Sequence, residues 1–349
     1  DWLALYHAPR VGAATFQRLL ETFQNPAGVM AASRSQLGQL GLAQPTIDAL
    51  RHPDQAAIER DLEWSAAAGN RILTRHDPDY PALLLQIPDP PSLLYVHGDA
   101  SLLGEPQLAM VGSRNPTASG AQTATEFARY LSAAGLVITS GLALGIDAAS
   151  HRGAVNAGNP TIAVMGTGLD RVYPARHRDL AREIARHGVL VSECPVGTPP
   201  RAENFPRRNR FISGLSLGTL VVEAALRSGS LISARYALEQ GREVFAIPGS
   251  IHNPLARGCH HLLRQGAKLV ETAQDVIDEL GALAGACQPA AAASDTAAAR
   301  PPDLGQEYSQ LLEYIEYEPT SIDLLVEKTG LTPAEVSSML LQLEMSGYI

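Results

Sequence analysis

The stretch that decides the fold is LAMVGSRNPTASGAQTATEFARYLSAAGLVITS, residues 108–140. It begins with a short apolar run, LAMVG, continues through a polar turn into the helical stretch ASGAQTATEFARYLSAAG, and ends in a second apolar run, LVITS. Short continuous apolar runs bounded by Gly, Ser or Pro are typical of strands that are buried on both faces of a parallel sheet. The stretch therefore predicts a strand, a turn, a helix and a second strand.

The same alternation repeats along the middle of the chain. Further apolar runs are TIAVM, VLVSE, TLVVE and EVFAI, with helical stretches such as ISARYALEQG between them. We therefore predict an α/β fold over residues 70–280, with a doubly wound, mostly parallel sheet and right-handed crossovers. Upstream of these runs, RILTR and SLLYVHG predict two more strands, which a Pro-rich segment separates.

Two smaller modules flank this block. Residues 1–69 contain short helical segments punctuated by glycines, which resemble a helix-hairpin-helix or SAM-like module; the acidity of the block favours a structural role. Residues 281–303 are rich in Ala and Pro and predict a flexible linker. Residues 304–349 predict three helices of a winged-helix-like module.

The third helix of that C-terminal module has clear start signals. Thr332 is placed to cap it, Pro333 occupies its first position, and Glu335 follows three residues after the cap. The helix carries no Lys or Arg, so binding of phosphate there would be electrostatically opposed. This favours a protein-contact or regulatory role, and the acidic module could also block a basic groove elsewhere.

Charge is distributed unevenly along the 349 residues, whose net charge is −9. Residues 108–280 carry 18 basic and 14 acidic side chains, whereas residues 1–107 carry 7 and 12, residues 281–303 carry 1 and 2, and residues 304–349 carry 1 and 8. A local positive patch, rather than the net charge, sets the affinity for phosphates. The acidic total therefore does not exclude a nucleic-acid partner.

The composition also indicates in which cellular compartment the protein lies and whether it binds a metal. The three cysteines are too few and too scattered for a disulfide or zinc framework. We find neither a signal peptide nor an apolar run long enough to span a bilayer. We therefore expect a cytoplasmic protein with no metal and no membrane association.

A cluster of arginines follows the fourth predicted strand of the middle block, in GTPPRAENFPRRNRFISGL, residues 197–215. We interpret this stretch as a cationic loop with an aromatic ring, Phe205, inside it. Such a combination is typical of proteins that bind single-stranded nucleic acid, because the cations follow the phosphates and the ring stacks a base. The alternative, in which the ring plugs the loop onto the sheet edge, stays open. The four arginines of the cluster are Arg201, Arg207, Arg208 and Arg210, of which Arg201 and Arg210 are our first candidates for DNA contacts.

Ligands of open α/β sheets bind beyond the carboxyl ends of the strands. There the chain has small residues whose backbone N–H groups can face an anion, and helix N-termini that add positive charge. Arg114 follows the first strand of the middle block, where its guanidinium either binds a phosphate or pairs with Glu193 or Glu223. Arg176 adds a cation after the third strand. The small residues that we single out at this edge are Ser113, Gly141, Ser228, Gly229 and Ser230.

Several of these segments together resemble one family. GSRNPTASG, TSGLALGIDAASHRGA, GTGLDRVYPARHRDL, FPRRNRFISGL and SGSLISARYALEQGREVFAIPGS are similar to the bacterial DNA-processing protein A family (DprA, also called Smf), over roughly residues 70–280. The resemblance implies a Rossmann-like domain that binds single-stranded DNA. It implies DNA-binding roles for Arg114, for a position at or beside Arg176, and for Arg201, Phe205, Asn209 and Arg210.

The resemblance also implies partners and a process. Members of the family form homodimers, protect incoming DNA, and load the RecA recombinase in place of single-strand-binding protein during natural transformation. The family is not catalytic, so the resemblance implies no enzyme activity and no cofactor.

Two other classes of function stay open. Related Rossmann-like folds include nucleotide-processing enzymes of the phosphoribohydrolase type, in which Glu223 would act as an acid or base. A pure protein-interaction scaffold would bind no DNA. The chain has no Walker A pattern and no full dinucleotide fingerprint, and its G-x-S-x-G match at residues 214–218 leads into a strand rather than opening a helix. We therefore expect no ATP hydrolysis, no NAD site and no serine nucleophile.

Overall fold

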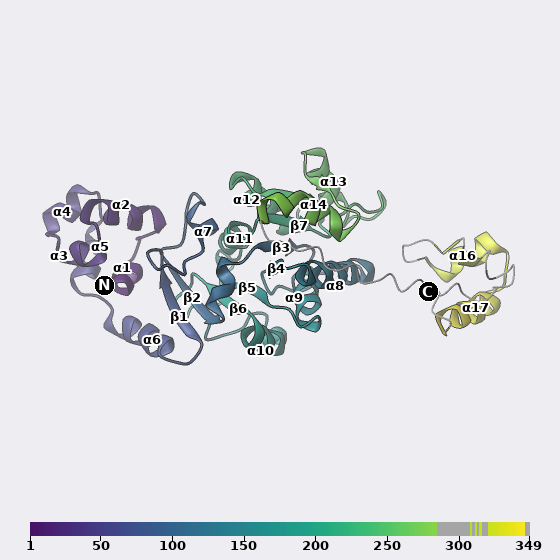
Figure 1. The fold of residues 1–349 in the computed structure, drawn as a ribbon, viewed down its shortest axis with the longest axis horizontal. Coiled ribbons are helices and arrows are strands. Elements are labelled where there is room, and N and C mark those ends of the chain that lie inside the picture. The colour runs from purple at the N-terminus through teal and green to yellow at the C-terminus, as the bar shows by residue number, and fades with distance from the viewer. Residues whose placement is uncertain (285–307, 309–310, 313, 316–319, 346–349) are drawn as a thin grey trace. The chain divides into compact units, whose positions relative to one another are not determined.

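The structure is a computed structural model that describes residues 1–284, 308, 311–312, 314–315 and 320–345 (Figure 1). The chain divides into two compact units, Asp1–Ala290 and Ala291–Ile349. The strands of the first unit are β1 (Asn70–Thr74), β2 (Leu93–Gly98), β3 (Gln107–Val111), β4 (Val137–Ser140), β5 (Thr161–Met165), β6 (Val189–Ser192), β7 (Gly218–Val221), β8 (Glu243–Ala246) and β9 (Lys268–Leu269).

These strands form one nine-stranded sheet in the order β1-β2-β6-β5-β4-β3-β7-β8-β9. The strands from β6 to β9 pair in parallel, whereas β2 pairs antiparallel with β6 and β1 antiparallel with β2. The predicted doubly wound, mostly parallel sheet is confirmed, and the two upstream strands extend it at one edge. The two-residue strand β9 was not predicted, because two residues are too few to show a pattern.

Helices cover both faces of the sheet, and each face has its own apolar core. Small residues of α8 pack in the core on its face of the sheet, where Ala124 and Ala128 are fully buried. Packing of this kind explains how a chain with only 5% aromatic residues forms a dense core. One face carries α7 (Ala82–Leu85), α11 (Asn204–Gly214), α12 (Ser230–Glu239) and α13 (Arg257–Arg264), and the other α8 (Ala118–Ala133), α9 (Ile146–Asn156), α10 (Arg178–His187) and α14 (Ala273–Ala284). Short 3-10 turns occupy η1 (Ala100–Gly104) and η2 (Ala175–His177).

The N-terminal segment is helical, as predicted; its helices enclose an apolar cluster and contact the sheet through a buried carboxylate. Asp61 accepts a hydrogen bond from the hydroxyl of Tyr95 on β2 at 2.5 Å, and its Oδ2 lies 2.7 Å from Nε2 of His7. Its other oxygen accepts from the backbone N–H of Val196, beyond β6. These contacts hold the helices against the sheet. The helices are α1 (Trp2–His7), α2 (Ala13–Phe23), α3 (Pro26–Ala31), α4 (Arg34–Gln39), α5 (Gln44–Arg51) and α6 (Gln55–Ser65).

The second unit contains α16 (Ile322–Thr329) and α17 (Pro333–Met345). The predicted start of α17 is confirmed: Glu335 Oε2 accepts from the backbone N–H of Thr332 at 2.8 Å, and Thr332 Oγ1 accepts from that of Glu335 at 3.3 Å. The first of the three helices predicted for residues 304–349, at residues 306–317, lies largely outside the described residues. So does the predicted linker, except that its first four residues belong to α14.

One segment differs from its prediction. The arginine-rich stretch was expected to be a loop, but its second half forms helix α11. Phe211, Ile212 and Leu215 are each 1% exposed, and Leu84 and Ile87 lie close against Gly214. Burial of this apolar side stabilises the helix, and Pro206 is tolerated because it lies in the first turn. The arginines are therefore distributed around a helix and face different surroundings.

Candidate functional site

A cavity of about 470 Å³ lies at the carboxyl ends of β3 and β7. Its walls come from the turn after β3, from α11 and from the start of α12. This is the edge at which open α/β sheets bind ligands. The structure brings seven of the residues predicted from the sequence together here: Ser113, Arg114, Phe205, Asn209, Ser228, Gly229 and Ser230.

Arg208 lines this cavity, although sequence reasoning did not single it out among the four arginines of the cluster. It is only 4% exposed, and its Nε and Nη1 have no hydrogen-bond partner. A buried donor without a partner costs free energy, and a buried charge costs more. The arrangement therefore suits an anion that would take these donors. A sequence signal existed: four cavity-lining residues of α11 follow the helical period i, i+3, i+4, i+7, namely Phe205, Arg208, Asn209 and Ile212.

A buried carboxylate, Asp147 in the first turn of α9, lies beside Arg208. It accepts hydrogen bonds from the backbone N–H groups of Gly141 at 3.1 Å and Ala143 at 3.3 Å. Burial raises the pKa of Asp147, which Arg208 opposes. Burial likewise lowers the pKa of Arg208 to about 10, which Asp147 opposes, so the guanidinium keeps its charge at neutral pH.

Gly141 was predicted to present its backbone to an anion. The structure also shows that a side chain at this position would clash with Arg208. A Cβ atom at this position would lie 1.5 Å from Nη1 of Arg208. Only glycine therefore leaves room for the Arg208 guanidinium at this point.

The turn after β3 is held by Glu223, which follows β7. The carbonyl of Glu223 accepts from the backbone N–H of Ser113 at 2.7 Å. Its carboxylate accepts from the backbone N–H of Thr117 at 2.9 Å and from the Thr117 hydroxyl at 2.6 Å, at the start of α8. Neither Glu223 nor Glu193 pairs with Arg114, and within the described ranges Arg114 forms no ion pair. The alternative that Arg114 forms a salt bridge to one of them is therefore wrong.

Phe205 lies where the cavity meets the sheet edge. Its ring packs on that of Tyr173, with 5.3 Å between the centroids, and the side chain is half-buried. A small adjoining cavity of about 60 Å³ is lined by Phe205, Tyr173, Arg114 and Arg208, among others. Phe205 thus packs against the sheet edge beside Gly166 and also contributes to the cavity wall. Stacking of a base on its ring stays a prediction.

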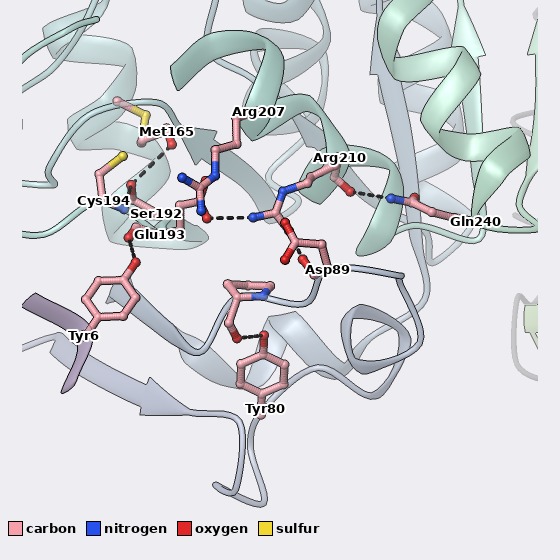
Figure 2. Close-up of polar contacts among 11 residues, drawn as sticks. Tyr6, Tyr80, Asp89, Met165, Ser192, Glu193, Cys194, Arg207, Arg210 and Gln240 are labelled. Carbon is pink, nitrogen blue, oxygen red and sulfur yellow. Dashed lines mark hydrogen bonds and ion pairs between the residues drawn. The ribbon is translucent and has the colours of Figure 1, made fainter. Parts of the chain in front are cut away.

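The other arginines of the cluster lie elsewhere (Figure 2). Arg210 is 5% exposed; its Nη2 donates to Glu193 Oε2 at 2.9 Å, and its Nη1 lies 3.3 Å from Asp89 Oδ2. Arg207 is more exposed, and its Nε lies 3.2 Å from Glu193 Oε1. Burial raises the pKa of Glu193, which both arginines oppose. Arg210 therefore belongs to a buried ion-pair network rather than to the cavity wall, contrary to its place among our first candidates.

Arg201 and Arg176 are exposed and do not line the cavity. Burial raises the pKa of the Cys194 thiol to about 11, which the charge of Arg201 opposes. Contacts of Arg176, Arg201, Arg207 and Arg210 with DNA stay predictions.

The cavity is chemically suited to an oxyanion. Three arginines line it, Arg114, Arg208 and Arg227, against the single carboxylate of Asp147. The start of α12 adds the positive end of a helix and the hydroxyls of Ser228 and Ser230, whose oxygens lie 2.7 Å apart. Among the described residues we find no group of three His, Cys, Asp or Glu side chains that would hold a metal ion, and no helix long and apolar enough to cross a membrane.

Comparison with known proteins identifies the family. A family model described as DNA recombination-mediator protein A matches residues 71–281. The chain belongs to this family. A second model, the DprA winged helix domain, matches residues 295–349, so the predicted winged-helix module is confirmed.

Relatives of the DprA family match along most of the chain. Protein Smf of Escherichia coli is 42% identical over 294 residues, covering 84% of this chain and 78% of the relative. Protein Smf of Synechocystis is 35% identical and covers 100% and 95%. The crystal structure of DNA processing protein A from Streptococcus pneumoniae superposes with a TM-score of 0.71 at 36% identity, covering 79% and 96%. The Helicobacter pylori DprA structure has a TM-score of 0.55 at 33% identity, covering 61% and 96%, and describes the single-stranded DNA binding mode of that protein.

Proposed function

We propose that this chain binds single-stranded DNA in the cavity at the carboxyl ends of β3 and β7. Arg114 and Arg208 bind phosphate, Phe205 stacks a base, and the start of α12 completes the anion site. Backbone contacts and stacking carry no base code, so the binding has little sequence specificity. The H. pylori relative, whose structure describes its single-stranded DNA binding, supports this assignment.

The observation that carries the proposal is the guanidinium of Arg208. It is buried in the cavity wall with donors that have no partner, beside the more exposed Arg114. A protein retains such a costly arrangement where a ligand supplies the missing acceptors. A phosphodiester oxygen fits both the charge and the number of donors.

We infer that the protein is not an enzyme. The rival hypothesis needed the Glu223 carboxylate as an acid or base, but that carboxylate is occupied by two hydrogen bonds from Thr117 and does not line the cavity. The Asp147 carboxylate is likewise occupied by backbone amides. Release of free base from a nucleoside monophosphate by the purified protein would contradict this inference.

From membership in the DprA family we further infer the biological role of the chain and its partners. The chain forms a homodimer, protects incoming DNA and loads the RecA recombinase onto it in place of single-strand-binding protein during natural transformation. The test is the assembly of RecA filaments on single-stranded DNA coated with single-strand-binding protein, with and without this chain. Filament assembly that does not accelerate when the chain is added would contradict the loading role.

DNA binding itself is tested by titrating a labelled oligothymidine at several salt concentrations. Each neutralised phosphate of a single strand contributes about 0.7 to the slope of log K against log salt. We expect Arg114→Ala to weaken binding and to flatten the slope by about that amount. Arg129→Ala, which removes an exposed charge from α8 outside the cavity, is the matched control. Wild-type affinity and slope in Arg114→Ala would overturn the assignment.

A further inference from the structure

A second cavity, of about 410 Å³, lies between the N-terminal helices and the sheet. From the N-terminal side its wall includes Tyr6, Arg10 and Gly12, and from the sheet side Glu193 and Arg207. Figure 2 shows Tyr6 and Arg207 on either side of the segment that holds Glu193. Because Glu193 directly follows β6, this cavity lies at the same carboxyl edge of the sheet as the first one.

The two cavities are neighbours across helix α11. Arg208 lines the first and Arg207, the preceding residue of the same helix, lines the second. Strands β3 and β6 are three strand spacings apart, which is about 15 Å. A stacked single strand advances about 3.4 Å per nucleotide, so a strand of about four to five nucleotides covers the interval.

The second cavity carries an unused positive charge. Arg10 is exposed and forms no hydrogen bond or ion pair with any other described residue, and its backbone is in the left-handed region, with φ of 62°. Its position in the turn between α1 and α2 places it beside the first residues of α2. The N-cap residue of that helix, Gly12, has no side chain to cap the first amides, and Gly12 and Ala13 both line the cavity.

The carboxylate in this cavity does not oppose an anion strongly. Glu193 is paired with both Arg207 and Arg210, at 3.2 and 2.9 Å. Arg210 also pairs with Asp89, so Arg207 and Arg210 offset two carboxylates, and Arg10 adds a third cation. The local balance is positive although residues 1–107 are acidic as a whole.

We propose that the cavity at the N-terminal helices is a second phosphate subsite, which binds the part of a single strand that continues past the first cavity along α11. This inference rests on the proposed function. The ligand of the subsite is the phosphodiester backbone, held by Arg10 and Arg207, without recognition of a base. The N-terminal helices thereby become part of the DNA-binding surface.

The test compares oligothymidines of two lengths on the full chain, one of about 3 nucleotides, which is too short to cover the interval, and one of about 16 nucleotides. The variant is Arg10→Asn, because asparagine is neutral and tolerates the left-handed backbone of this position. We expect it to bind the short oligonucleotide like the wild type. We expect it to bind the long one several-fold more weakly, with a salt slope flatter by about 0.7. Arg10→Glu should weaken the long complex further.

Arg18→Gln is the matched control, because Arg18 is an exposed cation of α2 that does not line the cavity. Wild-type binding of the long oligonucleotide by Arg10→Asn and Arg10→Glu would overturn the second subsite and leave the first intact. Equal losses on both lengths would also overturn it, because Arg10 would then act on the first cavity. Failure of the wild type to bind either length would instead contradict the proposed function.

Discussion

Two arginines on the same helix, separated by one residue, show how burial alone leaves function undecided. Arg208 and Arg210 are 4% and 5% exposed. Both terminal nitrogens of the Arg210 guanidinium face carboxylates, of Glu193 and of Asp89, and Nη1 also donates to the Asp89 carbonyl, so that only its Nε has no hydrogen-bond partner. Arg208 has Asp147 nearby as a charge, but its Nε and Nη1 donate to nothing.

The difference lies in whether the protein itself satisfies the cation. Where two carboxylates are supplied, a buried arginine joins segments of the chain, here α11 to the ends of β6 and of the connector before β2. Where the guanidinium donors face a cavity and have no hydrogen-bond partner, a buried arginine can bind an anion that enters from outside the protein. Both surroundings lie along one short arginine-rich motif.

The largest expected effect is a difference in folding stability between variants of Arg210 and of Arg208. Arg210→Met should lower the free energy of unfolding by about 3–5 kcal/mol, because it leaves the carboxylate of Glu193 buried with only the more exposed Arg207 as partner. Arg208→Met should lower stability less, because it removes buried donors that have no partner and because Asp147, which loses a nearby cation, keeps the backbone amides of Gly141 and Ala143. It should abolish tight binding of single-stranded DNA. Urea denaturation and oligothymidine titration of both variants measure the two effects. Equal losses of stability in the two variants would contradict the distinction between a structural Arg210 and an anion-binding Arg208.

The next effect concerns the aromatic part of the first cavity. Phe205→Ala should weaken binding of single-stranded DNA by about 1–3 kcal/mol, the value of one stacked base, and should leave the salt slope unchanged because no phosphate contact is lost. Arg201→Ala is expected to change both affinity and slope if Arg201 meets the strand. Titrations across ionic strength distinguish the two, and identical losses of slope would contradict the division between stacking and charge.

The sheet and its edge were predictable because buried parallel strands and strand-to-helix turns have local signatures. The runs around residues 108–112 and 136–140 correspond to β3 and β4, and the small residues after them lie at the cavity. The antiparallel pairing of β1 and β2 was not predictable in the same way. Their pairing depends on which edge of the sheet was free, and that is a property of the whole fold.

The arginine-rich stretch was harder to interpret, because its residue types are equally compatible with a loop and with a helix. Seven predicted site residues did meet at one cavity, but the choice between Arg208 and Arg210 depends on long-range partners. Glu193 and Asp89 come from segments far away in the sequence, and no spacing within α11 indicates which arginine they will pair with. Helical phase alone would have placed Arg208 beside Phe205 and Ile212.

The smallest expected effect tests the one carboxylate in the first cavity. Burial raises the pKa of Asp147, so the side chain takes up a proton more readily than an ordinary aspartate. As pH rises through that raised pKa, Asp147 gains a negative charge beside Arg208, and affinity for phosphate should fall. Asp147→Asn keeps an acceptor for the amides of Gly141 and Ala143 but carries no charge. It should therefore bind single-stranded DNA several-fold more tightly than the wild type at neutral pH.

The pH dependence separates this effect from a general change in the cavity. The two proteins should converge as the pH falls toward about 4, the ordinary value for aspartate, because the wild-type side chain is then neutral as well. Folding stability follows the same sign: a raised pKa means that the contribution of Asp147 is complete at low pH and is lost as pH rises through its folded value. Titrations of both proteins over this range measure the difference, and a constant ratio of affinities at every pH would show that the Asp147 charge does not reach the bound phosphate.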